Sequence, residues 1–171
     1  MRYIKLYSFI IICSLVLSHQ LQAKTSEQFA FKATTLAGEQ IDLNDYLGKQ
    51  AVYLKFWATW CHYCLAEMPH LQHIDDTYGD DIKVIAINVG ISDSVANINT
   101  LYKKEGYQVA TIFDEQGQLT QQFGVIGTPH HILIDKTGQI KYRTYLATDK
   151  LDDLLNQQAT QLAFSEGASN E

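Results

Sequence analysis

Two cysteines, Cys61 and Cys64, stand two residues apart as Cys-His-Tyr-Cys, and this pair is the strongest chemical signal in the sequence. A gap of two residues closes almost no loop, so a disulfide here would restrain the unfolded chain very little. The same spacing brings two thiols close enough to form and break a disulfide, which is typical of redox centres. The pair therefore predicts thiol–disulfide chemistry rather than a structural cross-link.

The cysteines lie where a predicted buried strand gives way to a predicted helix. Residues 51–57 form a near-continuous apolar run, as in strands covered on both faces. Apolar side chains at helical spacing follow and stop before Gly79: these are Leu65, Met68, Leu71, Ile74 and Tyr78. At this junction Cys61 meets unpaired backbone N–H groups and the positive end of the helix dipole, which favour the thiolate. We therefore expect Cys61 to be the nucleophile and Cys64, one turn further in, to be the resolving cysteine.

Strand and helix patterns alternate along the rest of the chain. The sequence predicts further strands at 83–89, 110–114, 131–134 and 139–145, and further helices at 92–105 and 149–162. Residues 135–138, Asp-Lys-Thr-Gly, indicate a hairpin between the last two strands. The alternation predicts one α/β domain over residues 24–163, with a central sheet flanked by helices, and a flexible tail over residues 164–171.

The N-terminal segment has the order of regions that marks a secretory signal. Arg2 and Lys5 precede an apolar run at 6–17, which is shorter than the roughly 18–20 residues of a membrane-spanning helix. The sequence therefore predicts a signal peptide over residues 1–23, which would also remove Cys13, and a periplasmic protein. An uncleaved membrane anchor is the alternative.

The composition excludes several classes of protein and partner. A chain that is 46% hydrophobic and 19% charged is globular rather than disordered. Thirteen basic and nineteen acidic side chains give a net charge of −6, which argues against a nucleic-acid partner. No dimerisation stripe is evident, so a monomer is expected.

The residues around the cysteines resemble the active-site segment of thioredoxins. Residues 56–64 read Phe-Trp-Ala-Thr-Trp-Cys-His-Tyr-Cys and include both tryptophans of that segment, Trp57 and Trp60. Glu67 and Pro69 extend the motif to C-x-x-C-x-x-E-x-P, which resembles the TlpA/ResA type of exported redoxin.

The resemblance covers about residues 29–155, of which 88–123 are similar to the insertion of the TlpA/ResA type. It implies a thioredoxin fold with a central mixed sheet, and a protein-disulfide oxidoreductase of the cell envelope that needs no cofactor. Its partners would be protein thiols and disulfides, with a membrane electron donor or thiol partner to recharge it. Gly-Thr-Pro at 127–129 is similar to the family's cis-proline loop, which implies a cis Thr128–Pro129 bond beside the cysteines and a Thr128 backbone free to pair with substrate.

Two signals bear on the direction of the reaction, and they disagree. The dipeptide between the cysteines is His62-Tyr63, and a histidine there can stabilise a thiolate. A low thiolate pKa makes the disulfide more oxidising. The resemblance implies mostly reductants, and a reductant is what we expect.

Lys55 departs from the thioredoxin pattern. It occupies the strand position at which thioredoxins bury an acid that helps the resolving cysteine lose its proton. One interpretation is that its amine reaches the surface; the other is that it lies near the thiols as a cation and lowers their pKa. Glu67 is the candidate for a replacement acid. Pro69, inside the predicted helix, removes one backbone hydrogen bond and predicts a kink.

A metal-binding interpretation stands beside the redox one. Two thiolates and one imidazole suit Cu(I) or zinc, so the alternative function is a copper chaperone that uses Cys61, Cys64 and His130. His131 follows directly, but neighbours on a strand point to opposite faces, so only one of the two histidines can face the sulfurs. Two further histidines, His70 and His73, are expected to face solvent.

A peroxidase is the third possibility, because redoxins include peroxiredoxins. The peroxiredoxin signature requires proline and threonine at fixed positions before the cysteine, and here those positions hold Leu54 and Ala58. Peroxidase activity is therefore the least expected of the three functions.

Overall fold

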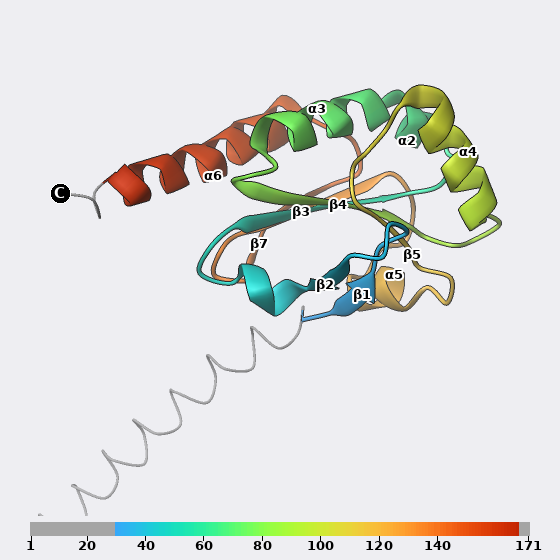
Figure 1. Ribbon diagram of the computed structural model, residues 1–171, viewed down its shortest axis with the longest axis horizontal. Helices are drawn as coiled ribbons and strands as arrows, with labels where there is room; N and C mark the ends of the chain where they lie inside the picture. Colours follow the sequence, from blue (N-terminus) through green and yellow to red (C-terminus); the bar gives the residue numbers. More distant parts are fainter. Residues whose placement is uncertain (1–29, 168–171) are drawn as a thin grey trace, which may run out of the picture.

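The computed structural model describes residues 30–167 of the chain (Figure 1). Its elements are β1 (Lys32–Thr34), β2 (Gln40–Asp42), the 3-10 helix η1 (Leu43–Tyr46), β3 (Ala51–Trp57), α2 (His62–Ala66), α3 (Met68–Tyr78), β4 (Ile82–Asn88), α4 (Val95–Glu105), β5 (Thr111–Phe113), α5 (Gln118–Gln122), β6 (His130–Ile134), β7 (Ile140–Thr144) and α6 (Asp149–Gly167). The predicted signal peptide, residues 1–23, lies outside the described residues.

The central sheet has five strands in the order β5-β4-β3-β6-β7. β4 runs parallel to β3 and β5, whereas β6 runs antiparallel to β3 and β7. The sheet is therefore mixed, and the hairpin predicted between the last two strands is confirmed. β3 is buried at every position, which explains its near-continuous apolar sequence.

Two layers cover the sheet (Figure 1). Helices α3 and α6 lie over one face, and the β1–β2 hairpin and α5 lie on the other. Helix α3 buries its apolar stripe of Met68, Leu71 and Ile74, each at most 3% exposed. Helix α4 and β5 fall within the predicted insertion and add one parallel strand to the edge of the sheet. The predicted α/β fold class is confirmed.

The long helix predicted after β3 is divided at Glu67, which ends α2 and begins α3. Pro69 lies in the first turn of α3, where its missing N–H removes no hydrogen bond of that helix. The kink predicted from Pro69 is thus a break between two helices. Glu67 consequently lies at a junction one turn after Cys64, whose carbonyl accepts its N–H at 3.2 Å.

Four short elements have no counterpart among the predicted ones: β1, β2, η1 and α5. Each has only three to five residues and no two adjacent apolar side chains, so neither a period nor an apolar run marks it. Helix α6 extends past its predicted end, so residues 164–167 of the predicted tail are helical, and residues 168–171 lie outside the described range. Within residues 30–167, no helix has the length and apolar character needed to cross a membrane.

Candidate active site

Cys61 and Cys64 form a disulfide at the start of α2, with their Cα atoms 5.2 Å apart. Cys61 is the N-cap of this helix, and its Sγ accepts the N–H of Cys64 at 3.2 Å. Cys61 keeps 6% of its surface exposed, whereas Cys64 keeps none. The cysteine predicted to attack is thus the more accessible one, and it already has a backbone donor that would stabilise its thiolate.

Aromatic side chains frame the disulfide in two different ways. Trp60 and Tyr63 are more than half exposed, and Tyr63 meets the ring of the exposed His62 edge-on, with centroids 5.9 Å apart. Trp57 is fully buried and stacks on Tyr102 at 6.0 Å. The exposed side chains of Trp60, His62 and Tyr63 can therefore contact a partner protein, whereas Trp57, the last residue of β3, packs inside the domain.

The loop before β6 contains the cis peptide bond that the resemblance implied. The Thr128–Pro129 bond is cis, Pro129 is buried and Thr128 is half-buried. Ile126, two residues before Thr128, is 87% exposed. An exposed apolar side chain thus lies next to the cis-proline loop.

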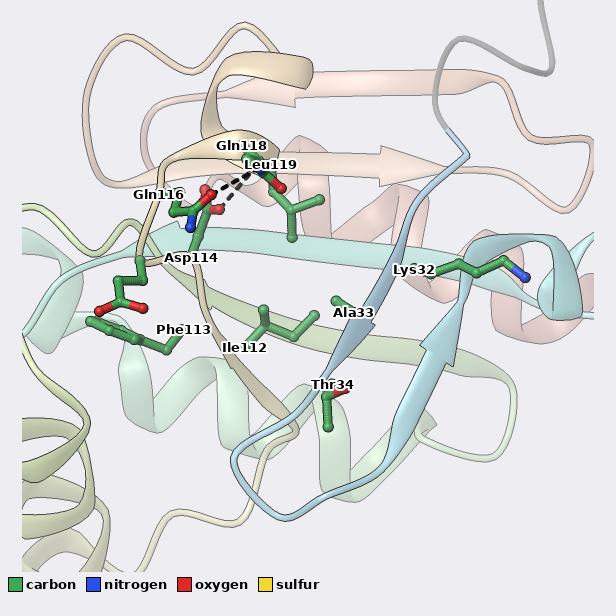
Figure 2. Close-up of a pocket in the computed structure, with 10 residues that line it drawn as sticks. Lys32, Ala33, Thr34, Ile112, Phe113, Asp114, Gln116, Gln118 and Leu119 are labelled. Carbon is green, nitrogen blue, oxygen red and sulfur yellow. Dashed lines mark hydrogen bonds between the residues drawn. The ribbon is translucent and has the colours of Figure 1, made fainter.

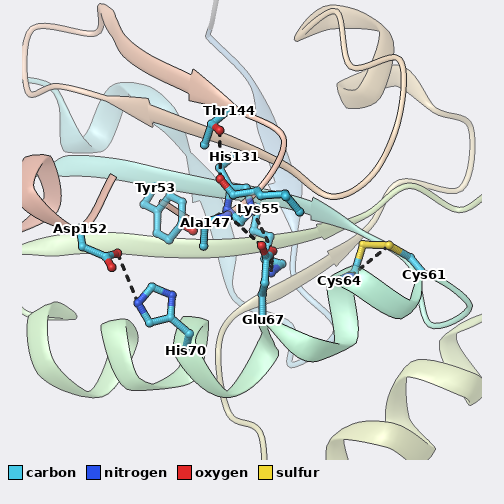
Figure 3. Close-up of polar contacts among 11 residues, drawn as sticks. Tyr53, Lys55, Cys61, Cys64, Glu67, His70, His131, Thr144, Ala147 and Asp152 are labelled. Carbon is cyan, nitrogen blue, oxygen red and sulfur yellow. Dashed lines mark hydrogen bonds and ion pairs between the residues drawn. A yellow bond between two sulfur atoms is a disulfide. The ribbon is translucent and has the colours of Figure 1, made fainter. Parts of the chain in front are cut away.

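A polar network lies on the sheet face that α3 covers (Figure 3). Lys55 Nζ lies 2.8 Å from Glu67 Oε2, and His131 Nε2 lies 3.0 Å from the same oxygen. His131 Nδ1 lies 2.7 Å from the Tyr53 hydroxyl, and Glu67 Oε1 accepts the N–H of Ala147 at 2.8 Å. The contacts form because Lys55 and His131 are paired in register across β3 and β6, beside the helix break at Glu67.

The charges in this network follow from burial and hydrogen bonding. Burial alone raises the pKa of Glu67, but hydrogen bonds from His131, Lys55 and the Ala147 N–H outweigh it and lower that pKa to about 2. Burial lowers the pKa of Lys55 and the pKa of His131, and Glu67 offsets only part of each shift. Because a carboxylate can only accept, neutral His131 carries its proton on Nε2, and its Nδ1 accepts from Tyr53.

Lys55 does not reach the surface, so that interpretation is wrong. The residue is fully buried because the Glu67 carboxylate supplies a partner inside the protein. A carboxyl group with a pKa of about 2 is also a weak base at neutral pH. The geometry therefore suits Glu67 to holding Lys55 and His131 in place better than to accepting the proton of Cys64.

His130 lies on the opposite face of the sheet from His131, where it packs edge-on against Tyr145 with ring centroids 5.1 Å apart. Within residues 30–167 neither ring nitrogen of His130 has a hydrogen-bond partner. No group of three His, Cys, Asp or Glu side chains in the described part of the chain is placed to hold a metal ion. The site suggested for a copper chaperone, Cys61 and Cys64 with His130, is thus not assembled.

The two histidines of α3 lie apart from the disulfide. His73 is exposed, as expected. His70 is half-buried, because its Nε2 lies 3.3 Å from the Asp152 carboxylate of α6 (Figure 3). Within residues 30–167, His70 forms no hydrogen bond with the network around Glu67, but its charge adds to the effect of burial, which lowers the pKa of His131.

Sequence reasoning missed the partner of the segment before Cys61. The N–H and the hydroxyl of Thr59 both lie 2.7 Å from the Asp93 carboxylate, which precedes α4. Asp93 and Ser94 lie inside the helix predicted over residues 92–105, whereas α4 begins at Val95 with Ser94 as its N-cap. The Asp-Ser pair is a capping signal that could have drawn attention to Asp93. Its contact with Thr59 joins positions 34 residues apart, and a pairing of that range leaves no local pattern.

A pocket of about 320 Å³ lies between β1 and the β5–α5 segment (Figure 2). Ala33, Ile112 and Leu119 form its apolar part, and Asp114 on its wall accepts the N–H of Leu119. None of the predicted site residues lines this pocket. The disulfide and its surroundings therefore form a separate site.

Known proteins are similar to this chain in sequence and in fold. Residues 25–143 match the model of the AhpC/TSA family. The chain is 34% identical over 112 residues to the thiol-disulfide oxidoreductase ResA of Geobacillus thermodenitrificans, a match that covers 65% of this chain and 63% of ResA. The chain thus spans just under two thirds of the length of this curated relative.

Solved structures show the same fold. The exposed lipoprotein thioredoxin Etrx1 of Streptococcus pneumoniae has a TM-score of 0.64 at 30% identity, over 75% of this chain and 98% of Etrx1. StoA of Bacillus subtilis has a TM-score of 0.64 at 24% identity, over 74% of this chain and 96% of StoA, which shows a shared fold. The predicted thioredoxin-like fold is confirmed. Because the family model matches most of its length, the chain belongs to the AhpC/TSA family.

Proposed function

We propose that this protein is a thiol–disulfide oxidoreductase that exchanges disulfides with other proteins through Cys61 and Cys64. The observation that carries the proposal is the disulfide at the start of α2, in which Cys61 is the more exposed cysteine at 6% and Cys64 is fully enclosed. The name of ResA, a thiol-disulfide oxidoreductase, and that of Etrx1, a thioredoxin, support the same activity.

The unequal exposure of the two cysteines gives the exchange a fixed order. In the reducing direction, the Cys61 thiolate attacks one sulfur of a substrate disulfide, and the other substrate sulfur leaves as a thiolate. Cys64, deprotonated, then attacks Cys61 Sγ, restores the intramolecular disulfide and releases the second substrate sulfur. Two electrons pass to the substrate. The proton that Cys64 gives up goes to the substrate thiolate released in the first attack, and the second substrate sulfur leaves as a thiolate that takes its proton from water.

The surface around the disulfide favours a protein substrate. Trp60, Tyr63, Ile91 and Ile126 are each more than half exposed and come from the segments next to the disulfide and the cis-proline loop. Exposed apolar side chains in one region are typical of a surface that binds a protein. The half-buried Thr128 would supply backbone groups for an extended substrate segment, which is the mode of strand addition.

We place this activity in the cell envelope, in the direction of reduction, with a membrane electron donor or thiol partner that recharges the pair. The predicted signal peptide and the description of Etrx1 as an exposed lipoprotein support the location. The similarity to ResA supports the TlpA/ResA type, for which reduction is expected.

The reduction potential of the Cys61–Cys64 pair tests both the activity and its direction. The purified protein is equilibrated with glutathione or dithiothreitol, and the fraction oxidised is followed. A potential near that of thioredoxin, roughly −270 mV, supports a reductant. A potential near roughly −120 mV identifies an oxidant. A pair that does not titrate as a two-electron couple overturns the proposed activity.

Serine variants test the order of the two cysteines. Cys61→Ser should abolish disulfide exchange, because the remaining sulfur is enclosed. Cys64→Ser should instead accumulate mixed disulfides with substrates, because the resolving attack is lost. The double variant is the control for non-specific capture. Full exchange activity in Cys61→Ser would contradict the assignment.

A further inference from the structure

Asp93, in the loop between β4 and α4, has a side chain that forms hydrogen bonds with three segments of the chain. Its carboxylate accepts the N–H and the hydroxyl of Thr59, both at 2.7 Å, and the Asn88 amide at 2.7 Å. It also accepts the N–H of Ser94 at 2.9 Å and the Asn97 amide at 3.3 Å. One side chain therefore joins the end of β4, the start of α4 and the residues just before Cys61.

The charge of Asp93 makes these bonds strong. Burial raises the pKa of Asp93, but the hydrogen bonds from Thr59, Asn88 and Ser94 outweigh it and hold the pKa below its usual value. Hydrogen bonds to an ionised acceptor are about twice as strong as those between neutral groups. The Thr59 peptide is thus fixed by two charge-assisted bonds.

Two further contacts join the residues before Cys61 to the segment after β4, on either side of the contact between Thr59 and Asp93. Trp60 Nε1 donates to the carbonyl of Ile91 at 2.7 Å, and Trp57 stacks on Tyr102 of α4. Three of the four residues before Cys61 are therefore held by the insertion that contains α4. Asp93 is the only charged group among these contacts.

We propose that Asp93 is a positioning residue of the redox centre, which holds the Thr59–Trp60 peptide so that Cys61 stays at the start of α2 when the disulfide opens. The proposal rests on the proposed exchange activity. In the oxidised form the S–S bond itself fixes Cys61 Sγ. When the S–S bond opens, that restraint is lost, and the backbone on either side of Cys61, its packing and the Cys64 N–H are left to place the sulfur. Looser backbone weakens that hydrogen bond, destabilises the thiolate and so favours the disulfide.

The sign of the effect separates positioning from simple electrostatics. Removing the negative charge of Asp93 would by itself stabilise a neighbouring thiolate and favour the dithiol. Loss of positioning acts in the opposite direction and favours the disulfide. Thr59→Val removes one hydrogen bond to Asp93 without changing any charge, so it reports positioning alone. Thr59→Ser keeps the hydroxyl and should behave as the wild type.

The test is the equilibrium of each variant with glutathione, measured beside its stability to urea. Asp93→Ala should shift the equilibrium about tenfold towards the disulfide, which is about 30 mV for a two-electron couple. Thr59→Val should shift it about threefold in the same direction. The matched control is Asp135→Ala, because Asp135 accepts bonds from Thr137 and Gln139 in the β6–β7 turn and also has a lowered pKa. This control should lose stability while its equilibrium stays within about twofold of the wild type.

Two results would overturn the proposal while leaving the exchange activity intact. One is a shift towards the dithiol in Asp93→Ala with no shift in Thr59→Val, which is a charge effect. The other is a loss of stability in both variants with an unchanged equilibrium, which is a purely structural role. A wild-type pair that does not titrate as a two-electron couple would instead remove the proposed function itself. If Asp93→Ala does not fold, Thr59→Val against Thr59→Ser decides the question.

Discussion

His130 and His131 are neighbours in β6, yet their surroundings differ completely. His131 is bonded on both ring nitrogens, to Tyr53 and to Glu67. His130 is also buried, at 6% exposed against 1% for His131, but in the described part of the chain its nitrogens have no hydrogen-bond partner. A buried polar group without a partner costs about 1–3 kcal/mol of stability. The two side chains should therefore respond in opposite ways to the same substitution.

We expect His130→Phe to raise the free energy of unfolding by about 1 kcal/mol, because it removes two unpaired nitrogens and keeps the edge contact with Tyr145. His131→Phe should lower the free energy of unfolding by about 2 kcal/mol, because the Tyr53 hydroxyl loses its acceptor and Glu67 Oε2 loses one donor. Urea unfolding of both variants measures this. Equal losses in the two variants would contradict the assignment of partners.

The Lys55–Glu67 pair leads to a prediction about coupling. Glu67→Gln should cost about 3 kcal/mol, because it leaves a fully buried ammonium beside a neutral amide. Lys55→Met should cost less, because Glu67 keeps His131 and the Ala147 N–H as donors. The double variant Lys55→Met/Glu67→Gln should be more stable than the sum of the two losses predicts. A double-mutant cycle in urea checks this, and additive losses would show that the pair is not coupled.

At the scale of elements, the sequence predicts those that carry a clear apolar pattern. β3 is predictable from its near-continuous apolar run, and α3 from its apolar side chains at helical spacing. β1, β2 and α5 are not, because they are short and no two apolar residues are adjacent in any of them. The order of the strands also leaves no local mark, since β6 pairs with β3 across most of the domain.

The candidate site divides in the same way. Cys61, Cys64 and Pro129 are predictable because their chemistry depends on residue type and short spacing. The burial of Lys55 is not, because it depends on Glu67 and His131, which come from other elements. The contact of Asp93 could not be predicted for the same reason, since its partner Thr59 lies in another segment.

The junction between β4 and the loop that carries Asp93 depends on one glycine. Gly90 has a φ of +74°, and a Cβ atom there would lie 2.5 Å from the Asp114 carbonyl oxygen. Gly106, which ends α4, has a similar φ of +76°, but a Cβ there would meet nothing within 4 Å. The two positions share the backbone strain and differ only in the steric clash.

Gly106→Ala should therefore cost about 1–2 kcal/mol, the strain of a left-handed conformation for a residue with a Cβ. Gly90→Ala should cost clearly more, because the clash with backbone adds to the same strain. Thermal unfolding of the two variants under one condition gives the difference. Equal losses would show that the contact between Gly90 and Asp114 relaxes without cost.

For the whole molecule, buried titratable groups on both faces of the sheet set the dependence of stability on pH. Burial lowers the pKa of His130, and Arg143 and His131 add to this; burial also lowers the pKa of His131, against the pull of Glu67. Glu67 has a pKa of about 2 in place of its usual 4.5. All three groups bind fewer protons in the folded protein than in the unfolded chain, so each favours unfolding as the pH falls.

The histidines and Glu67 affect the free energy of unfolding in separate pH ranges. The histidines contribute their full stability above the unfolded-state pKa of about 6.5, and the contribution declines as the pH falls below it. Glu67 retains its contribution down to about pH 4.5 and loses it as the pH approaches 2. Between pH 6.5 and 5 the histidines therefore act without Glu67.

We expect the free energy of unfolding to fall between pH 7 and pH 5 by up to about 1.4 kcal/mol per pH unit for each of the two histidines, once the pH is below 6.5. Urea unfolding at intervals across this range measures the slope. His130→Phe should reduce the slope, because one of the two buried imidazoles is then gone. The same slope in wild type and variant would mean that His130 takes up its proton in the folded state, and stability rising towards pH 5 would contradict the direction of both shifts. The change in pH dependence caused by His130→Phe therefore tests the burial of His130 separately from the change in stability that the same substitution causes.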